Sequence, residues 1–270
     1  MAISNQKGGV GKTTTTVNIA VALALQGVSV LVIDLDPQGN ASTALGVPHH
    51  SEVPSIYDVM VDDMPLGDAA VPVAVAGSLR CVPSTIDLAG AEIELVPLQA
   101  RESRLRRAVS AHLEGLRTAG TDPPDYILID SPPSLGLLTL NALVAADEVL
   151  LPIQCEYYAL EGLEQLIRTI ERVTAHLNAG LRVSTILLTM YDARTRLAEQ
   201  VAQEVRQHFG ELVLPAVIPR SVRISEAPGF GQSVITYDPG SRGATAYFEA
   251  ARDIALRGAP GSHDAPGVSA

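Results

Sequence analysis

The chain of 270 residues has no tryptophan, only 4% aromatic residues and two cysteines. So few aromatic side chains leave little for recognition of nucleic-acid bases by stacking. Cys81 and Cys155 lie far apart and form no CxxC pattern, which favours a reduced, cytoplasmic location. No run of about 18 uncharged apolar residues occurs, so we expect no transmembrane helix. No apolar stretch precedes Gln6, so a signal peptide is not expected.

Basic residues are also scarce, since the net charge is −11. This charge argues against a uniformly basic nucleic-acid binder but says nothing about local patches. Lys7 and Lys12 are the only lysines, and the other 17 basic residues are arginines. A GC-rich genome explains why lysine is rare, but not why both lysines lie in one glycine-rich stretch. A compact ammonium on a flexible stem suits a phosphate site, where the planar guanidinium is not equivalent.

Short β-branched apolar runs alternate with longer amphipathic segments along the chain. The expected strands are 2–5, 29–34, 79–82, 126–130, 148–153, 182–190 and 212–218, and the expected helices are 12–25, 101–116, 137–145, 159–177, 197–209 and 244–256. This alternation predicts an α/β fold, a doubly wound, mostly parallel sheet with helices on both faces.

One domain accounts for the length, because no linker or internal repeat divides the chain. We expect it to cover residues 1–257, with 51–77 as a peripheral excursion of loop and short helix. Residues 258–270 are too poor in apolar side chains to order themselves and are expected to form a disordered tail. The first strand has little room, because only four residues precede the loop whereas strands usually have five or six. Either this strand is short or the start codon is misassigned.

A phosphate-binding loop is indicated where a strand, a glycine-rich turn and a helix follow one another. Gly8, Gly9 and Gly11 allow backbone N–H groups to turn towards a phosphate, and the next helix adds the positive end of its dipole. Lys12 can reach the β- and γ-phosphates, and the Thr13 hydroxyl can bind Mg²⁺. The pattern GxxxxGK[ST] fails at its first position, where Gln6 replaces glycine.

The stretch Lys7–Thr14, KGGVGKTT, resembles the deviant Walker A box of the ParA/MinD group of ATPases. Residues 33–40 resemble the second box of this group, and residues 129–133 resemble its Walker B strand end. Three further stretches, at 156–162, 189–195 and 218–228, narrow the resemblance to chromosome-partitioning ParA/Soj proteins. The similarity extends from residue 2 to about residue 256.

The resemblance implies an ATP hydrolase that uses ATP and Mg²⁺, with weak intrinsic activity that a partner stimulates. It assigns nucleotide binding to Lys7, Gly8, Gly9, Val10, Gly11, Lys12, Thr13 and Thr14, with base contacts from Pro219 and Ser221. It makes Lys7, Lys12 and Asp36 catalytic, with Asp36 orienting or activating the attacking water. Thr13 and Asp130 would hold Mg²⁺ and Asp34 would support the site. The three aspartates follow apolar strands, where α/β sheets bind ligands.

The resemblance also implies two macromolecular contacts. Lys7 and Gly8 would lie at a two-fold interface, where Lys7 contacts the nucleotide of the other subunit in an ATP-bound homodimer. Arg194, Arg196, Arg220 and Arg223 would bind double-stranded DNA without sequence preference, although most surface charges are merely solvated. A ParB-type centromere-binding protein would stimulate hydrolysis, so that chromosome or plasmid origins are partitioned on the nucleoid. A second run, Arg101, Arg104, Arg106 and Arg107, is a minor candidate for DNA or partner contact.

Three other classes share parts of this pattern. A MinD-like ATPase that positions division at the membrane needs a basic amphipathic C-terminal helix, but residues 258–270 contain no lysine or arginine. An iron–sulfur reductase of the nitrogenase iron-protein type needs paired cluster thiolates, and we expect Cys81 and Cys155 to be strand or core residues instead. A general ATPase regulator with no DNA role would differ in a nucleotide-dependent DNA shift assay.

Overall fold

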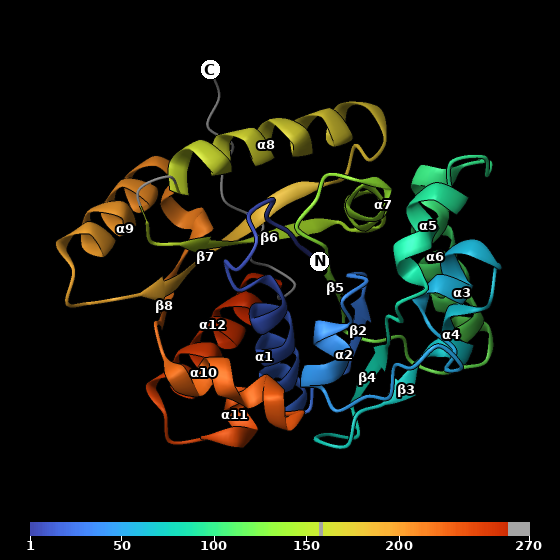
Figure 1. Ribbon diagram of the computed structural model, residues 1–270, viewed down its shortest axis with the longest axis horizontal. Helices are drawn as coiled ribbons and strands as arrows, with labels where there is room; N and C mark the ends of the chain where they lie inside the picture. Colours follow the sequence, from blue (N-terminus) through green and yellow to red (C-terminus); the bar gives the residue numbers. More distant parts are fainter. Residues whose placement is uncertain (157–158, 259–270) are drawn as a thin grey trace.

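The computed structural model describes residues 1–156 and 159–258. Within them, eight strands form one sheet in the order β3-β4-β2-β5-β1-β6-β7-β8 (Figure 1). Every neighbouring pair is parallel except β3–β4. The strands are β1 (Ala2–Ile3), β2 (Val30–Asp34), β3 (Val71–Pro72), β4 (Leu79–Val82), β5 (Tyr126–Asp130), β6 (Glu148–Gln154), β7 (Arg182–Tyr191) and β8 (Val213–Pro219).

Helices cover both faces of the sheet. One face carries α1 (Lys12–Leu25), α2 (Asn40–Ala44), α10 (Val222–Glu226), α11 (Val234–Tyr237) and α12 (Arg242–Gly258). The other face carries α3 (Ile56–Val61), α4 (Leu66–Ala69), α5 (Leu88–Glu94), α6 (Arg104–Thr118), α7 (Leu137–Ala145), α8 (Ala159–His176) and α9 (Arg196–Phe209). Short 3₁₀ turns at Arg101–Ser103, Gly210–Leu212 and Ala227–Phe230 complete the element order.

The central strands show why this sequence forms a two-sided sheet. Successive side chains of a strand point to opposite faces, and β2 is apolar throughout before its final aspartate. Leu31 and Ile33 pack into the core on the side of α3–α9, whereas Val30 and Val32 pack into the core on the side of α1 and α12. All five β2 residues are buried, as expected for a parallel strand covered on both faces.

The register of the sheet brings the candidate site together. In the β2–β5 pair, Asp34 is the direct partner of Asp130, so two carboxylates end neighbouring strands at the same level. β1 pairs with both β5 and β6, which places the glycine-rich loop after β1 between these strand ends. The phosphate loop and the aspartates therefore lie at the carboxyl edge of one sheet.

The predicted fold class and the expected strands and helices are confirmed, with small changes at their ends. The first strand is short, and Asn5, which was expected to belong to it, lies in the following loop. Residues 51–77 contain α3 and α4 as expected, but also β3, which the sequence did not predict. α12 extends to Gly258, and the expected disordered tail from residue 259 onward lies outside the described residues. Within the described ranges, no helix has the length and apolarity needed to span a membrane.

Candidate active site

The phosphate loop adopts backbone conformations that require glycine at two positions. Gly9 and Gly11 have φ values of +76° and +90°, in the left-handed region that side chains disfavour. Gly11 is the N-cap residue immediately before α1, so the free N–H groups of the first helical turn lie at the loop. A cavity of about 580 Å³ opens here, lined by Gly8, Gly9, Lys12 and Thr13 among others. Its position at a helix N-terminus suits an anion.

Two side chains that the sequence analysis missed hold this loop. Asn5 donates from Nδ2 to the Pro152 carbonyl at 2.8 Å and accepts the Lys7 N–H at 3.0 Å. Thr189, near the end of β7, donates its hydroxyl to the Val10 carbonyl at 2.8 Å. Their only signal in the sequence is a position at a strand end. They fix the loop to β6 and β7.

Lys12 lies inside the site, with 6% of its surface exposed. Its Nζ donates to the Lys7 carbonyl at 3.2 Å. Burial lowers the pKa of Lys12, while the charges of Asp130 and Asp36 oppose that shift. The ammonium is thus desolvated and near two carboxylates, so a phosphate that enters the cavity would gain a strong, weakly hydrated cation.

Asp34 and Asp130 are both fully buried. Ser42 donates to Asp34 Oδ2 from its backbone N–H at 2.8 Å and from its hydroxyl at 2.7 Å, and Thr16 donates to Asp130 Oδ1 at 3.0 Å. Burial raises the pKa of Asp34 to about 6. Burial, together with the neighbouring charge of Asp34, raises the pKa of Asp130 to about 8. These carboxylates are costly to ionise unless a cation joins them.

The donor set fits Mg²⁺. Among the described residues, the buried Oδ2 of Asp130 has no hydrogen-bond partner. Thr13 lines the cavity, and its side chain is near enough to Asp130 to oppose the rise in the pKa of that carboxyl. No group of three or more histidine, cysteine or acidic side chains in the described part of the chain could enclose a metal by itself. Mg²⁺ suits such a partial set, because it keeps waters and takes phosphate oxygens as further ligands.

Asp36 lines the same cavity as the glycines of the phosphate loop. It is 7% exposed, and its Oδ1 accepts the Gln38 N–H at 3.0 Å. Its backbone N–H points to Asp34 Oδ1 at 3.4 Å, which links the two aspartates. The geometry therefore presents one carboxylate to the cavity and keeps another behind it.

A second cavity of about 490 Å³ adjoins the first, and Gly11, Thr14 and Met190 line both. Pro219 and Ser221, predicted to contact the base, line this second cavity. The sequence analysis missed Met190, which has a φ of +51° at the end of β7. Because a side chain in that conformation is strained, the residue is a candidate for a binding role.

Lys7 and Gly8 are placed differently from the rest of the loop. The Lys7 ammonium forms an ion pair with Glu156 of its own chain, and half of the Lys7 side chain is exposed. Gly8 does not have a positive φ, and a Cβ added there would meet no described atom within 4 Å. Nothing that is described within the chain therefore requires glycine at position 8.

The four arginines predicted to bind DNA lie near the ends of β7 and β8, but they are not equivalent. Arg194 grips Asp192 with two hydrogen bonds of 2.9 and 2.8 Å, and this contact lowers the Asp192 pKa to about 2. Arg223 pairs with Glu226 and Asp238. In the described part of the chain, neither Arg196 nor Arg220 forms an ion pair as Arg194 and Arg223 do. Arg220 is nevertheless near enough to Asp192 to help lower the pKa of that carboxyl.

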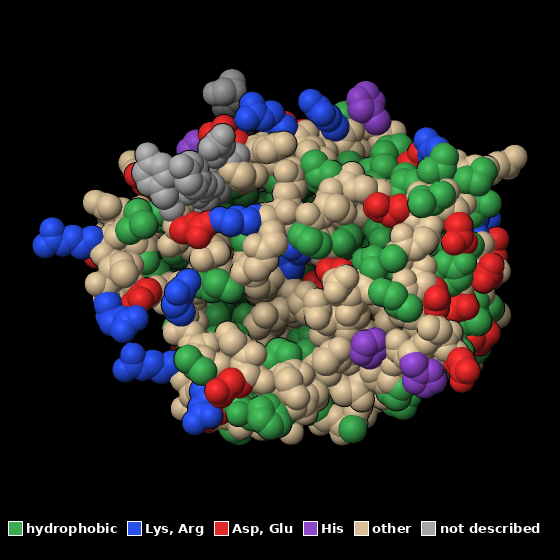
Figure 2. Space-filling view, viewed as in Figure 1, with side chains coloured by type: hydrophobic (Ala, Val, Ile, Leu, Met, Phe, Trp, Pro, Cys, Tyr) green, Lys and Arg blue, Asp and Glu red, His purple; other side chains and the backbone are tan. Residues whose placement is uncertain are grey.

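Charge is unevenly distributed over the visible face. In Figure 2, lysine and arginine side chains gather on the left, where Figure 1 places α9 and α10, and acidic side chains gather on the right, over α3 to α6. Residues 51–100 contain eight acidic residues and one arginine. Residues 190–230 contain five of each sign. The net negative charge of the chain therefore does not come from residues 190–230, whose charges balance.

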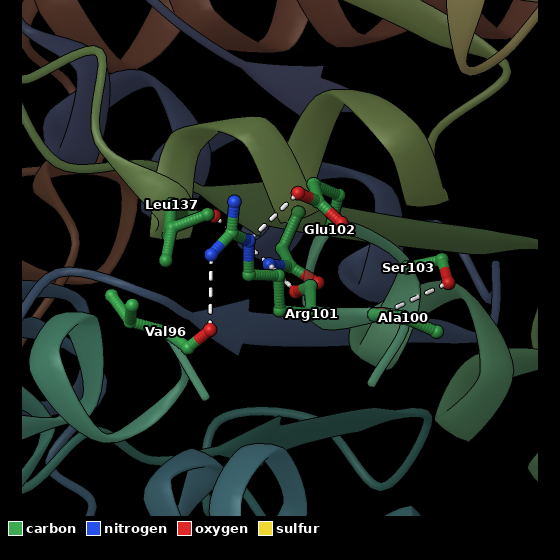
Figure 3. A network of polar contacts seen from close by, with 7 residues as sticks. Val96, Ala100, Arg101, Glu102, Ser103 and Leu137 are labelled. Carbon is green, nitrogen blue, oxygen red and sulfur yellow. Dashed lines mark hydrogen bonds and ion pairs between the residues drawn. The ribbon is translucent and has the colours of Figure 1, made fainter. Parts of the chain in front are cut away.

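Two members of the second arginine run have structural partners, whereas Arg106 and Arg107 are exposed and their suggested contact with DNA or a partner stays a prediction. Figure 3 shows Arg101 donating to the Val96 carbonyl and to Glu102. Asn141 of α7 donates to the Arg101 carbonyl at 2.8 Å. Arg104 is 8% exposed and binds carbonyls at the end of α3 as well as Asp63. Arg104 joins α6 to the end of α3 and is too buried to bind DNA, whereas the Arg101 side chain is 41% exposed.

Cys81 and Cys155 are buried, as expected for strand or core residues. Cys81 lies in β4 and Cys155 follows β6, and three strands separate β4 from β6 in the sheet. The two sulfurs of one chain therefore cannot bind one cluster, which disfavours the iron–sulfur alternative.

Comparisons with known proteins agree with this geometry. A family model described as an AAA domain matches residues 1–183. The sporulation initiation inhibitor protein Soj of Bacillus subtilis is 51% identical over 96% of this chain and 98% of its own length. The chromosome partitioning protein ParA of Caulobacter vibrioides is 52% identical over 95% of this chain and 94% of its own.

Solved structures share the whole fold. Cobyrinic acid a,c-diamide synthase from Mycobacterium smegmatis, with bound ADP and magnesium, superposes with a TM-score of 0.80 at 37% identity and covers 100% of this chain and 98% of its own. The septum site-determining protein MinD of Pyrococcus horikoshii, complexed with Mg-ADP, has a TM-score of 0.75 at 28% identity over 96% of this chain and 98% of its own. The phosphate loop, the strand-end aspartates and the near full-length identity to Soj and ParA lead to one conclusion: the chain belongs to the ParA/Soj family of chromosome-partitioning ATPases.

Proposed function

We propose that the chain is a DNA-segregation ATPase that hydrolyses ATP slowly and alternates between a monomer and an ATP-bound homodimer. The observation that carries the proposal is a cavity at a helix N-terminus that is lined by Lys12, Thr13 and Asp36. The fully buried Asp130, whose charge acts on Lys12, keeps one carboxylate oxygen without a partner among the described residues. Such a site suits phosphoryl transfer to water, which needs positioning and charge neutralisation more than covalent chemistry. The single domain proposed for residues 1–257 supplies all of these groups.

We assign each site residue a role that its position supports. The N–H groups at Gly8–Thr14 and the Lys12 ammonium bind the phosphates, while Pro219, Ser221 and Met190 contact the base. Thr13 and Asp130 hold Mg²⁺, and Asp34, fixed by Ser42, supports Asp130. When bound there, the metal would supply positive charge that neutralises the phosphate oxygens. Asp36 orients or activates the attacking water, because it is the carboxylate that the cavity wall presents.

The homodimer supplies the link between ATP and DNA. Lys7 contacts the nucleotide of the second subunit, and Gly8 permits the close approach of the two loops. Dimer formation brings two sets of Arg194, Arg196, Arg220 and Arg223 together, so that weak phosphate contacts add up on nucleoid DNA without sequence preference. A ParB-type partner stimulates hydrolysis in the cytoplasm and releases the dimer, which moves chromosome or plasmid origins apart.

DNA binding measured with ATP, with ADP and without nucleotide tests this proposal. We expect wild type to bind only with ATP. The Asp36→Ala variant should hydrolyse ATP about 100-fold more slowly or worse, since general-base groups contribute at least that factor. It should therefore remain on DNA with ATP. Fluorescence anisotropy with a short duplex of random sequence gives the affinities, and phosphate release gives the rates.

Arg117→Ala is a suitable control for this assay, because Arg117 is an exposed residue of α6 that pairs only with Glu114 within the described residues. It should bind DNA as wild type does. Equal DNA binding by wild type under all three nucleotide conditions would refute the switch. Binding to anionic lipid vesicles with ATP, but not to DNA, would point to a MinD-like membrane role instead.

A further inference from the structure

Lys7 is the less buried of the two lysines, yet its ammonium forms an ion pair. It pairs with Glu156, a residue that follows the end of β6 and whose side chain is 32% exposed. β6 is the strand beside β1, from which the phosphate loop emerges. The ion pair therefore ties the loop to the neighbouring strand end within one subunit.

A second contact connects this pair to the phosphate site. Lys12 donates its Nζ to the carbonyl of Lys7 at 3.2 Å, and Asn5 accepts the Lys7 N–H at 3.0 Å. Both lysines thus use groups of their own chain as partners. A phosphate that takes the Lys12 ammonium removes one of the bonds that hold the Lys7 backbone, so nucleotide binding loosens the residue that Glu156 retains.

We infer that Glu156 is a positioning residue that retains Lys7 in its own subunit and so opposes dimer formation until ATP is bound on both sides. The inference rests on the proposed function, in which Lys7 contacts the nucleotide of the second subunit. An ammonium paired with a carboxylate is partly neutralised and attracts a second anion less strongly. A carboxylate left beside the partner's phosphates would also repel them. The ion pair sets the threshold at which two ATP-loaded subunits associate.

The Glu156→Gln variant tests this role, because it keeps the size of the side chain and removes its charge. The measurement is the dissociation constant of the dimer by sedimentation equilibrium, with ATP and Mg²⁺, in the Asp36→Ala background that blocks hydrolysis. We expect the constant to fall about tenfold, because a partly exposed ion pair is worth a few-fold and two pairs open per dimer. Nucleotide affinity of the monomer should not change, since Glu156 contacts Lys7 and not the cavity lining.

Glu148→Gln is the matched control. Glu148 lies at the other end of β6, forms an ion pair with Arg182 and gives the same change in charge. It should leave the dimer constant unchanged. A double-mutant cycle provides a further test. Lys7→Ala should abolish the dimer whether or not Glu156→Gln is present, because the glutamate acts only through the lysine.

The results separate the inference from the proposed function. If the Asp36→Ala protein with native Glu156 stays monomeric with ATP, the proposed switch fails and the inference fails with it. If that protein forms a dimer but Glu156→Gln leaves it unchanged or weakens it, only the inference is overturned. A weaker dimer would mean that Glu156 aims Lys7 outward. A tighter ATP dimer, with ADP still giving monomer, supports the inference.

Discussion

The carboxylates that end β2 and β5 and the arginines that follow β7 and β8 lie at the same edge of one sheet, in opposite environments. Asp34 and Asp130 are fully buried, and their pKa values are raised because burial disfavours the charged forms. The side chains of Arg194 and Arg223 are 86% and 57% exposed, and each forms an ion pair with a nearby acid. A buried charge demands a partner of fixed geometry, whereas a solvated charge accepts many partners weakly. The first group suits a metal–phosphate unit and the second suits a DNA backbone.

The largest effect on function is expected from a change at Asp130, the buried carboxylate proposed to hold Mg²⁺. Asp130→Asn keeps the acceptor for the Thr16 hydroxyl but loses the negative charge that would hold Mg²⁺. We expect Mg²⁺-dependent ATP affinity to fall about 10- to 100-fold, the range seen when groups that orient metal ligands are lost. Titration calorimetry at several Mg²⁺ concentrations measures this.

Asp125→Asn is the control, since this exposed residue lies just before the opposite end of β5 and accepts the Ser29 N–H. It should not alter ATP affinity. If Asp130→Asn binds MgATP as tightly as wild type, the buried carboxylate is not part of the metal site, and the contrast with the arginine loops loses its functional meaning.

The same variant should stabilise the protein when nucleotide and metal are absent. The folded-state pKa values of Asp34 and Asp130, about 6 and about 8, exceed the ordinary carboxyl value, so the native state binds more protons than the unfolded state between about pH 4 and pH 8. The contribution of these groups to stability is therefore most favourable below about pH 4 and is lost as pH rises through 8.

At pH 8.5, with EDTA and without nucleotide, Asp130→Asn should raise the free energy of unfolding by about 2 kcal/mol, the usual order for removing an uncompensated buried charge. Urea denaturation at several pH values measures the gain, which should shrink towards pH 4. An unchanged or lower stability at pH 8.5 would contradict the buried, unpartnered state of this carboxylate.

The smallest effects are expected among the arginines, and their ranking tests the solvated half of the comparison. Arg220→Ala should weaken DNA binding of the ATP dimer about three- to tenfold and reduce the slope of log K against log salt by about 2, one unit for each subunit. Arg194→Ala should cost less, because Asp192 already compensates this arginine. Wild type should show a slope near −5 if about six arginines contact phosphates.

Anisotropy titrations with DNA between about 50 and 300 mM salt measure these slopes. Over this range the Debye length falls from roughly 14 to 6 Å. A flat salt response in wild type would contradict an arginine surface for DNA altogether. A larger loss from Arg194→Ala than from Arg220→Ala would mean that the Asp192 pair opens on DNA at little cost.

The candidate site residues that belong to short, contiguous motifs could be predicted from the sequence. The glycine loop, Lys12, Thr13 and the three strand-end aspartates were predicted, because apolar strands and a glycine turn announce the carboxyl edge of a parallel sheet. Most strands were also predicted within about two residues. Strand β3 was not, because two residues that include Pro72 carry no apolar pattern and pair only by tertiary contact.

The supports of the site were not predictable in the same way. Ser42, Thr16 and Asn5 are ordinary polar residues whose roles appear only when a distant acceptor lies beside them. Met190 is visible only through its backbone angle. Arg104 was grouped with exposed arginines because its sequence neighbours are also basic, but the end of α3 lies over it and uses it as a capping group. Spacing along a chain gives no account of such contacts.

The hydroxyl of Thr189 has a mechanical consequence. It joins the Val10 carbonyl at the crest of the phosphate loop to the strand that continues, two residues later, into Tyr191 and the Arg194 turn. Any displacement of the loop backbone must therefore either break this one bond or pull the tip of β7 with it. This hydrogen bond connects the phosphate loop to the turn that carries Arg194. The Thr189→Val substitution would remove that connection.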